Sequence, residues 1–179
     1  MRSCRFRHPL LSVLCALLLG FAAGACGARE PASPLIVARD GQSQITIIPD
    51  WLDLRDLTHD EAQIQVGSRL LNQYLIVLTE PRPADVPLAL FAKIGIEQLM
   101  SGIEGAQTTG PVEAQIGGLP AQRFEAIGVH DGHRLGYLYY ALQGTRNQYQ
   151  IVAWCAAEDF PRLKPTFQAV AETFREIVR

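Results

Sequence analysis

AQRFEAIGVHDGHRLGYLYYALQGTRNQYQIVAWC, residues 121–155, is the most informative part of the chain for its architecture. It contains three runs rich in β-branched and aromatic residues, a composition typical of strands. We predict these strands at 121–129, 134–142 and 147–155. Asp131-Gly132, between the first two runs, is a strong signal for a two-residue hairpin turn. The segment therefore predicts an antiparallel meander.

Strand-like segments also precede this meander. We predict them at 35–37, 44–48, 62–66, 75–78 and 107–116. Asp40-Gly41 lies between the first two and predicts a second hairpin. Apolar and polar residues alternate over 62–66, which predicts a strand with one face buried. The continuous apolar run 75–78 is typical of a central strand.

Two segments repeat apolar residues at steps of three and four, the period of an amphipathic helix. The first stripe is Leu88, Phe91, Ala92, Gly95, Ile96, Leu99 and Ile103, and the second is Phe160, Leu163, Phe167, Val170, Ala171, Phe174 and Val178. We expect Asp85 to cap the first helix and Gly102 or Gly105 to lie near its end. Hairpins with separate helices indicate an α+β fold, an antiparallel β-sheet flanked by two amphipathic helices. The periodicity leaves open whether both helices cover the same face.

The order of several short motifs resembles the α-β-α sandwich shared by the photosystem protein PsbP, the Mog-type nuclear-import factor and the bacterial DcrB-type lipoproteins. These motifs are Ile45 to Trp51, Gly110-Pro111-Val112, Gly117-Gly118-Leu119-Pro120-Ala121, the strand from Tyr149 to Trp154, and the last helix with Phe167 and Phe174. The resemblance implies a single globular domain of PsbP/Mog-like fold at 35–179. It also implies an accessory, adaptor or assembly role, because members of this superfamily mostly act in these ways and not as enzymes.

The first 25 residues have the features of a secretory signal peptide. Three arginines, with no acidic residue among them, precede an apolar run from Leu10 to Phe21. About 20 apolar residues are needed to span a bilayer, so this shorter run predicts a cleaved signal and not a retained helix. Small residues at 22–25 complete a cleavage region that ends at Cys26.

Ala23-Gly24-Ala25-Cys26 resembles a bacterial lipobox, in which the cysteine is acylated and becomes the new N-terminus. The resemblance implies a palmitate-type lipid on Cys26. It also implies the periplasmic leaflet of the outer membrane, because Gly27 replaces the Asp that retains such proteins in the inner membrane. The alternative is ordinary cleavage after Ala25. In the first case 26–34 is the lipidated cysteine and a short linker, whose last eight residues reach at most about 28 Å.

The composition limits the classes of partner. Removal of residues 1–25, which hold three of the 16 basic residues and none of the 18 acidic ones, leaves a formal net charge of −5. An acidic domain is not expected to bind nucleic acid or anionic lipid. We expect no nucleotide and no cofactor, membrane contact through the lipid, and an envelope protein as partner. Cys155, in an apolar strand, is interpreted as a buried core thiol.

His130, Asp131 and His133 form the one metal-like cluster in the sequence. In a two-residue hairpin the two histidines face each other across the strands, within reach of one ion. The alternative is a solvated turn whose geometry is set by Asp131-Gly132, since zinc sites use three or four ligands. We favour the turn and assign no metal site.

The aromatic residues of the meander suggest a groove. Tyr137 and Tyr139 lie on one face of the predicted strand 134–142, and Tyr140 lies on the other. Tyr137, Tyr139 and Trp154 could line a groove for a peptide or a lipid-like ligand if no helix covers their face completely. The alternative is packing of these rings in the core beneath the helices.

The sequence contains no nucleophile elbow, P-loop or dinucleotide fingerprint, and His59, Asp60 and Glu61 are interpreted as a solvated charge cluster. We therefore expect a membrane-anchored envelope lipoprotein that is not an enzyme and acts as an accessory, adaptor or assembly factor near the membrane. The alternative is a small-ligand or metal-binding periplasmic module that uses the aromatic groove or His130 and His133.

Overall fold

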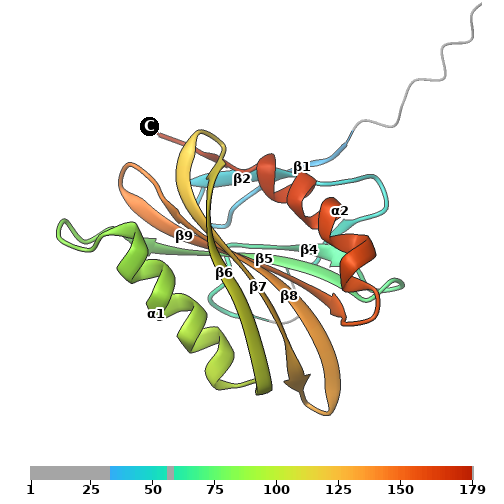
Figure 1. Cartoon of the computed structure of the whole chain (residues 1–179). Helices are drawn as coiled ribbons and strands as arrows, with labels where there is room; N and C mark the ends of the chain where they lie inside the picture. The colour runs from blue at the N-terminus through green and yellow to red at the C-terminus, as the bar shows by residue number, and fades with distance from the viewer. Residues whose placement is uncertain (1–32, 56–58, 179) are drawn as a thin grey trace, which may run out of the picture. The chain divides into compact units, whose positions relative to one another are not determined.

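The computed structural model describes residues 33–55 and 59–178 (Figure 1). The chain divides into two units, residues 1–30 and 31–179. The second unit contains every described helix and strand and two hydrophobic cores, so it is a folding unit of its own. The predicted signal peptide at 1–25, Cys26 and most of the predicted linker lie outside the described residues. Across the described ranges no helix is long and apolar enough to cross a membrane.

Seven strands form the main sheet. They are β3 (Leu52–Asp53), β4 (Ile64–Ser68), β5 (Gln73–Pro81), β6 (Glu104–Ile116), β7 (Leu119–His130), β8 (His133–Gln143) and β9 (Asn147–Ala156). They pair antiparallel throughout, in the spatial order β3-β4-β5-β9-β8-β7-β6. The predicted meander is confirmed as β7, β8 and β9, and β5 lies inside the sheet as its apolar run predicted.

The turn between β7 and β8 has the geometry that Asp131-Gly132 predicted. Both residues have positive φ, 49° and 77°, as a two-residue type I′ turn requires. Because the turn fixes the register, His130 is paired directly with His133. The same register continues to Ala121 and Leu142 at the far end of the two strands.

A second, smaller sheet joins the two ends of the described chain. Its strands are β1 (Leu35–Val37), β2 (Ser43–Thr46) and β10 (Arg175–Glu176), in the order β1-β2-β10. The predicted hairpin around Asp40-Gly41 is confirmed by the β1–β2 pairing. The pairing of β10 with β2 was not expected, and it places Glu176 opposite Ser43.

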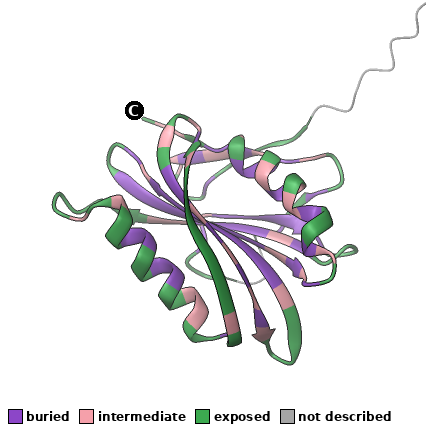
Figure 2. Ribbon diagram, in the orientation of Figure 1, coloured by how far each residue is buried: buried purple, intermediate pink, exposed green. Residues whose placement is uncertain are grey.

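α1 (Leu88–Ser101) and α2 (Phe160–Glu172) lie on opposite faces of the main sheet (Figure 1). α1 packs on β6, β7 and β8 over a core that includes Tyr139. α2 packs on β8 and β9 over a larger core that includes Phe167. Figure 2 shows buried residues along the strands between the two helices. The fold is thus α+β, an antiparallel sheet flanked by two helices, as the sequence predicted.

The helix ends differ in part from expectation. Gly102 is the C-cap of α1, as predicted, but the residue before its first turn is Pro87 and not Asp85. Pro87 is extended, with φ −69° and ψ 152°, and helices commonly begin at or just after a proline because its φ is fixed and it has no N–H to satisfy. The expected cap at Asp85 is therefore wrong by two residues.

The apolar stripe of α2 is shorter than predicted. The helix ends at Glu172, where the hydroxyl of Thr173 donates to the carbonyl of Val170 at 2.6 Å and accepts from the backbone N–H of Thr46 at 2.8 Å. Phe174 is fully buried just beyond the helix, whereas the side chain of Val178 is 61 % exposed. Phe174 is spaced as if it continued the helix, but it lies outside α2, because the chain has already turned toward β10.

The prediction of a half-buried strand at 62–66 is wrong, since β4 is buried at all five of its positions. The side chain of Gln65, expected to face solvent, is 2 % exposed. Its amide donates to the carbonyl of His59 at 2.7 Å and accepts from the N–H of the same residue at 3.2 Å. The segment that leads into β4 therefore covers the polar side of the strand.

Candidate functional site

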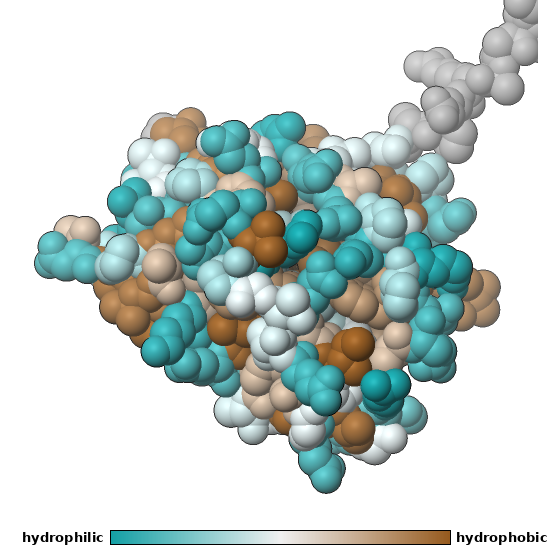
Figure 3. Space-filling view, in the orientation of Figure 1, coloured by the Kyte–Doolittle hydropathy of each residue, from teal (hydrophilic) through white to brown (hydrophobic). Residues whose placement is uncertain are grey.

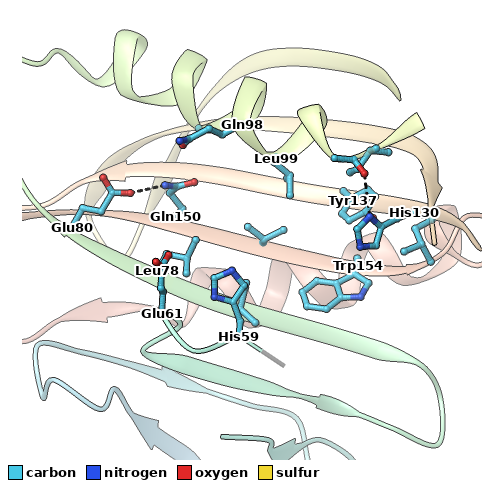
Figure 4. Close-up of a pocket in the computed structure, with 16 residues that line it drawn as sticks. His59, Glu61, Leu78, Glu80, Gln98, Leu99, His130, Tyr137, Gln150 and Trp154 are labelled. Atoms are coloured by element: carbon cyan, nitrogen blue, oxygen red, sulfur yellow. Dashed lines mark hydrogen bonds between the residues drawn. The ribbon is translucent and has the colours of Figure 1, made fainter. Parts of the chain in front are cut away.

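An open pocket of about 680 Å³ lies on the α1 side of the main sheet (Figure 4). This volume is typical of small-molecule sites. α1 packs on β6, β7 and β8, whereas β5 and β9 provide the floor of the pocket beside it. We call this pocket the trough. Its apolar lining residues are Ile76, Leu78, Leu99, Ile103, Leu135, Tyr137, Val152 and Trp154, and its polar ones are His59, Glu61, Glu80, Gln98, His130 and Gln150.

The floor of the trough follows from the alternation of side chains along two paired strands. The residues that face it are Ile76, Leu78 and Glu80 from β5, and Gln150, Val152 and Trp154 from β9. Their neighbours Val77 and Ile151 belong to the core on the opposite face, beneath α2. Each strand therefore offers an apolar stretch that ends in a polar side chain, on the same side of the sheet.

α1 forms one wall of the trough and approaches the sheet closely at Gly95. A Cβ atom on Gly95 would overlap the hydroxyl of Tyr139 on β8. Glycine inside a helix costs roughly 0.5–1 kcal/mol relative to alanine. Here the missing side chain allows α1 to lie directly on Tyr139. This close approach fixes the position of the wall relative to the floor.

Tyr139 begins a chain of hydrogen bonds that reaches the trough. Its hydroxyl donates to Oε1 of Gln150 at 3.1 Å, and Nε2 of Gln150 donates to Oε1 of Glu80 at 2.8 Å. Burial, and then the nearby Glu80 carboxylate, raise the pKa of the Tyr139 phenol, so this hydroxyl stays protonated and remains a donor. The chain thus holds the Glu80 carboxylate in a defined orientation.

One end of the trough is acidic. Figure 4 shows Glu61 and Glu80 at this end, Glu61 from the segment before β4 and Glu80 from β5. Within residues 33–55 and 59–178, neither carboxylate forms an ion pair. The two negative charges therefore act on the space of the trough and are not neutralised by a neighbouring side chain.

The other end of the trough is aromatic, with Tyr137, Trp154 and His130 (Figure 4). The Trp154 indole stacks on Tyr74, with ring centroids 5.3 Å apart and an interplanar angle of 24°. Nδ1 of His130 lies 3.1 Å from the carbonyl oxygen of Gly102 at the C-terminus of α1. This contact ties the β7–β8 turn to the helix and closes the aromatic end.

The structure brings the two histidines of the predicted metal-like cluster together but gives one of them another contact. His130 and His133 are directly paired across the hairpin. His130 turns its Nδ1 to Gly102, and its Nε2 lies 3.7 Å from the Asp131 carboxylate. No group of three or more His, Cys, Asp or Glu side chains among the described residues is placed to hold a metal ion.

The three residues of the predicted aromatic groove are divided between pocket and core. Tyr137 and Trp154 line the trough. Tyr139 is on the same face, as predicted, but it is fully buried between α1 and the sheet. Tyr140 lies in the core on the opposite face. Both alternatives for these aromatic residues are therefore realised. Two of them line a groove, and the other two pack in the cores.

The acidic end of the trough was not anticipated from the sequence. Glu61 and His59, interpreted as part of a solvated charge cluster, are exposed and also line the trough. Gln150 is 8 % exposed, although it carries a polar amide in the middle of an apolar strand. One pattern in the sequence could have revealed the site. Polar Gln148 and Gln150 alternate with apolar residues in β9 and share a face with Val152, which indicates that part of this face is polar.

Cys155 lies on the opposite side of the sheet from the trough. It is a free thiol, 2 % exposed, in the core beneath α2. Burial, and then the nearby Asp159 carboxylate, raise the pKa of the thiol to about 11. The side chain is therefore protonated at neutral pH, which is the state of an unreactive core cysteine.

Exposed apolar side chains outside the trough form small patches separated by hydrophilic residues in the view of Figure 3. The most exposed of them is Leu70, at 91 %, followed along the chain by Leu71 at 51 %. Both lie in the turn between β4 and β5. Leu52, 63 % exposed, is paired with Gly67 close to the same turn.

No protein-family model matches the chain, and no curated protein sequence matches it. Solved structures do resemble it. The cyanobacterial PsbP protein, CyanoP, of Synechocystis sp. is 14 % identical, with a TM-score of 0.61 over 87 % of this chain and 99 % of that one. LpqN of Mycobacterium tuberculosis, described as involved in cell envelope biogenesis, is 13 % identical, with a TM-score of 0.61 over 82 % of this chain and 91 % of that one.

The Ran-binding protein Mog1p of Saccharomyces cerevisiae also resembles the chain. It is 11 % identical, with a TM-score of 0.54 over 80 % of this chain and 94 % of that one. At these identities the likeness is one of fold. It confirms the PsbP/Mog-like architecture that the order of motifs from Ile45 to Phe174 implied, while a specific likeness to DcrB-type lipoproteins stays a prediction.

Proposed function

We propose that this chain, which has the PsbP/Mog-like fold, is a lipid-anchored accessory protein of the cell envelope that binds a small molecule in the trough and does not catalyse a reaction. The observation that carries the proposal is the incomplete cover of one sheet face by α1, which leaves an open pocket of about 680 Å³ with an apolar floor and polar ends.

The envelope part of the proposal rests on the N-terminal sequence and on one structural neighbour. Residues 1–25 have the pattern of an export signal, and Cys26 stands where a lipobox places its acylated cysteine. LpqN, which shares the fold, is described as involved in cell envelope biogenesis. An accessory role of this kind is compatible with both, and we place the protein on the periplasmic leaflet of the outer membrane.

The chemistry of the trough favours binding over catalysis. Its polar groups are carboxylates, amides and two imidazoles. The Tyr139 hydroxyl beneath it is kept protonated by a raised pKa and is engaged with Gln150, so it is a poor nucleophile. Cys155, the free thiol, is buried on the other side of the sheet.

The exposed leucines favour a second candidate, an adaptor that contacts an envelope protein. Leu70 and Leu71 project from the β4–β5 turn, and Leu52 lies close to the same turn. Exposed apolar side chains grouped at one end of a sheet are suited to a protein interface. In this alternative the turn binds the partner, and the trough is a separate feature.

Cross-linking in the native envelope tests the proposal. Wild type is compared with Cys26→Ser, which removes the acceptor of the lipid, and with Leu70→Ser/Leu71→Ser. We expect wild type in the membrane fraction and Cys26→Ser released from it. Native mass spectrometry of the wild-type protein should show the added mass of a bound small molecule. A specific protein cross-link that disappears in the double leucine variant, with no bound small molecule, would favour the adaptor instead.

A further inference from the structure

We infer that the trough takes an amphiphile with a cationic head group, an ammonium on an alkyl or aryl body. This inference rests on the proposed function, because it names the class of ligand for the same site. It follows from the order of side chains along the floor and from the unbalanced charge at one end.

The floor has the shape of a linear site. Trp154, Val152 and Gln150 are alternate residues of β9 that all face the trough. From Gln150 to Trp154 the strand rises by four residue steps, or about 13 Å. The site therefore offers an aromatic surface, then an aliphatic one, and then hydrogen-bonding groups, in a line. A ligand that uses the whole floor has an apolar body and a polar group at one end.

The charge at the polar end is negative. The Glu80 carboxylate is oriented by Gln150 through its Oε1, and its Oε2 accepts no hydrogen bond from the described residues. Glu61 lies at the same end (Figure 4) and adds a second carboxylate without an ion pair to any described residue. An ammonium group placed there interacts favourably with two opposite charges, whereas an anion is repelled by both.

The next two basic side chains after Glu80 in the sequence are engaged elsewhere. Arg82 donates to the carbonyl of Gly144 at 3.0 Å, away from the trough lining. Lys93 of α1 lies 3.9 Å from Glu97 on the exposed side of the helix.

The aromatic end also tolerates a cation, because the faces of Trp and Tyr rings carry partial negative charge. Neither end of the trough therefore disfavours a positively charged ligand. The carboxylates determine which end holds the ammonium. Tyr137 and Trp154, the latter stacked on Tyr74, contact the apolar body at the other end.

Three probes of equal chain length test the charge preference: n-octylammonium, n-octanol and n-octanoate. Their binding to residues 31–179, the unit that holds both cores, is measured by calorimetry below the concentrations at which they form micelles. Trp154 fluorescence gives an independent reading, since the other tryptophan, Trp51, is 1 % exposed in the α2 core. We expect the Kd of octylammonium to be about tenfold below that of octanol, equivalent to about 1.4 kcal/mol, with octanoate weakest.

Two variants locate the preference. In Glu61→Gln/Glu80→Gln the Kd of octylammonium should rise to the octanol value, while octanol binding stays unchanged. Glu97→Gln makes the same kind of charge change on the exposed side of α1 and should leave the preference intact. Higher salt should reduce the preference in wild type.

The outcomes separate this inference from the proposed function. If octanol or octanoate binds wild type as tightly as octylammonium, or if Glu61→Gln/Glu80→Gln keeps the preference, the cationic ligand class is wrong and the trough remains a binding site. If none of the three probes binds, the trough is not a site for linear amphiphiles and the inference fails, whereas the small-molecule part of the proposed function is decided by the native mass measurement of the wild-type protein. The membrane anchor is decided by Cys26→Ser alone.

Discussion

The hydroxyl of Tyr139 occupies the space that a side chain at Gly95 would need. The two residues lie on different elements, one on β8 and one on α1, and their contact fixes the wall of the trough against its floor. The hydroxyl continues into the hydrogen bonds to Gln150 and Glu80. Helix position and the acidic end of the trough therefore depend on one point of close packing.

Gly95→Ala should destabilise the protein. Alanine gains up to about 1 kcal/mol of helix propensity, but its Cβ overlaps Tyr139, and overpacking of a core costs about 1–3 kcal/mol. We expect the free energy of unfolding in urea to fall by about 1–2 kcal/mol. Gly102→Ala is the control, because Gly102 has φ −95° and its Cβ would meet no atom within 4 Å.

A double variant tests the cause of this loss. Tyr139→Phe removes the hydroxyl, so Gly95→Ala should cost less in that background, with a coupling energy of at least about 0.5 kcal/mol. Additive effects of the two substitutions, or a Gly95→Ala protein as stable as wild type, would show that the contact does not set the position of α1.

The protein should lose stability as the pH rises from 9 to 12. Burial raises the pKa of Cys155 from 9.0 to about 11 and that of Tyr149 from 10.0 to about 12. The unfolded chain releases these protons first, so each group lowers the free energy of unfolding by up to about 1.4 kcal/mol per pH unit between its two pKa values. Below pH 9 both contributions are fully present.

Urea titrations at several pH values measure this dependence. Cys155→Ala should remove the loss of stability between pH 9 and 10. It should reduce the slope between pH 10 and 11, where the raised pKa values of Tyr149 and Tyr139 still contribute. An unchanged slope in Cys155→Ala below pH 11 would show that the pKa of the thiol does not differ between the native and the unfolded state.

Glu176→Gln should weaken the attachment of β10 at pH values where the Glu176 carboxyl is ionised, and should have no effect in acid, where it is protonated. Burial alone would raise the pKa of Glu176, but hydrogen bonds from the N–H of Thr145, at 2.9 Å, and the hydroxyl of Tyr149, at 3.0 Å, hold it below 4.5. This stabilisation is present above pH 4.5 and is lost as the pH falls through the native pKa. Because the carboxylate is partly exposed, we expect a loss of about 1 kcal/mol at pH 7.

The difference between wild type and Glu176→Gln should vanish at the lowest pH at which the protein stays folded, as measured by urea unfolding. Glu158→Gln, at an exposed position, is the matched control and should have no effect. Equal losses at pH 7 and in acid would assign the effect to packing of the side chain and not to its charge.

Thr173→Val should separate α2 from the small sheet. The Thr173 hydroxyl accepts from the N–H of Thr46 at 2.8 Å, and its single proton lies within reach of the carbonyl oxygens of Val170, at 2.6 Å, and Thr46, at 2.9 Å. Valine keeps the shape but leaves a part-buried N–H without its acceptor, at a cost of about 1–3 kcal/mol. Thr108→Val, on the exposed strand β6, should change the free energy of unfolding by less than about 0.5 kcal/mol. Hydrogen exchange at the Thr46 amide gives a local reading of the same change.

Local turn chemistry and periodicity were sufficient to predict most of the fold. Asp131-Gly132 specifies a turn with two positive φ angles, and the meander around it follows. The helical stripes led correctly to two helices. Their placement on opposite faces was not predictable, because a period shows that a helix has an apolar side but not which face of a sheet it meets.

The errors occurred where distant segments decide the local structure. β4 alternates in sequence, yet the segment around His59 covers its polar side and satisfies Gln65. Phe174 continues the period of α2, yet the chain leaves the helix at Thr173 to pair with β2. In both cases a contact across the fold outweighs the pattern within the segment.

The candidate site was only half predictable for the same reason. Tyr137 and Trp154 are aromatic residues on adjacent strands, and sequence reasoning placed them near a groove. Glu61 and Glu80 lie on either side of the β4–β5 hairpin, and Gly95 lies on a helix between two strands. These residues meet in one pocket because of the order of strands in the sheet and because α1 leaves β5 and β9 uncovered.

The pairing of β2 with β10 has a consequence for how the chain acquires its structure during synthesis. Ser43 leaves the ribosome long before Glu176, so one edge of β2 waits without its neighbour until almost the whole domain has emerged. A product that stops before Arg175 retains a bare strand edge, open to pairing with another chain and to proteases. The small sheet can therefore close only at the end of synthesis, after the rest of the domain is available to fold.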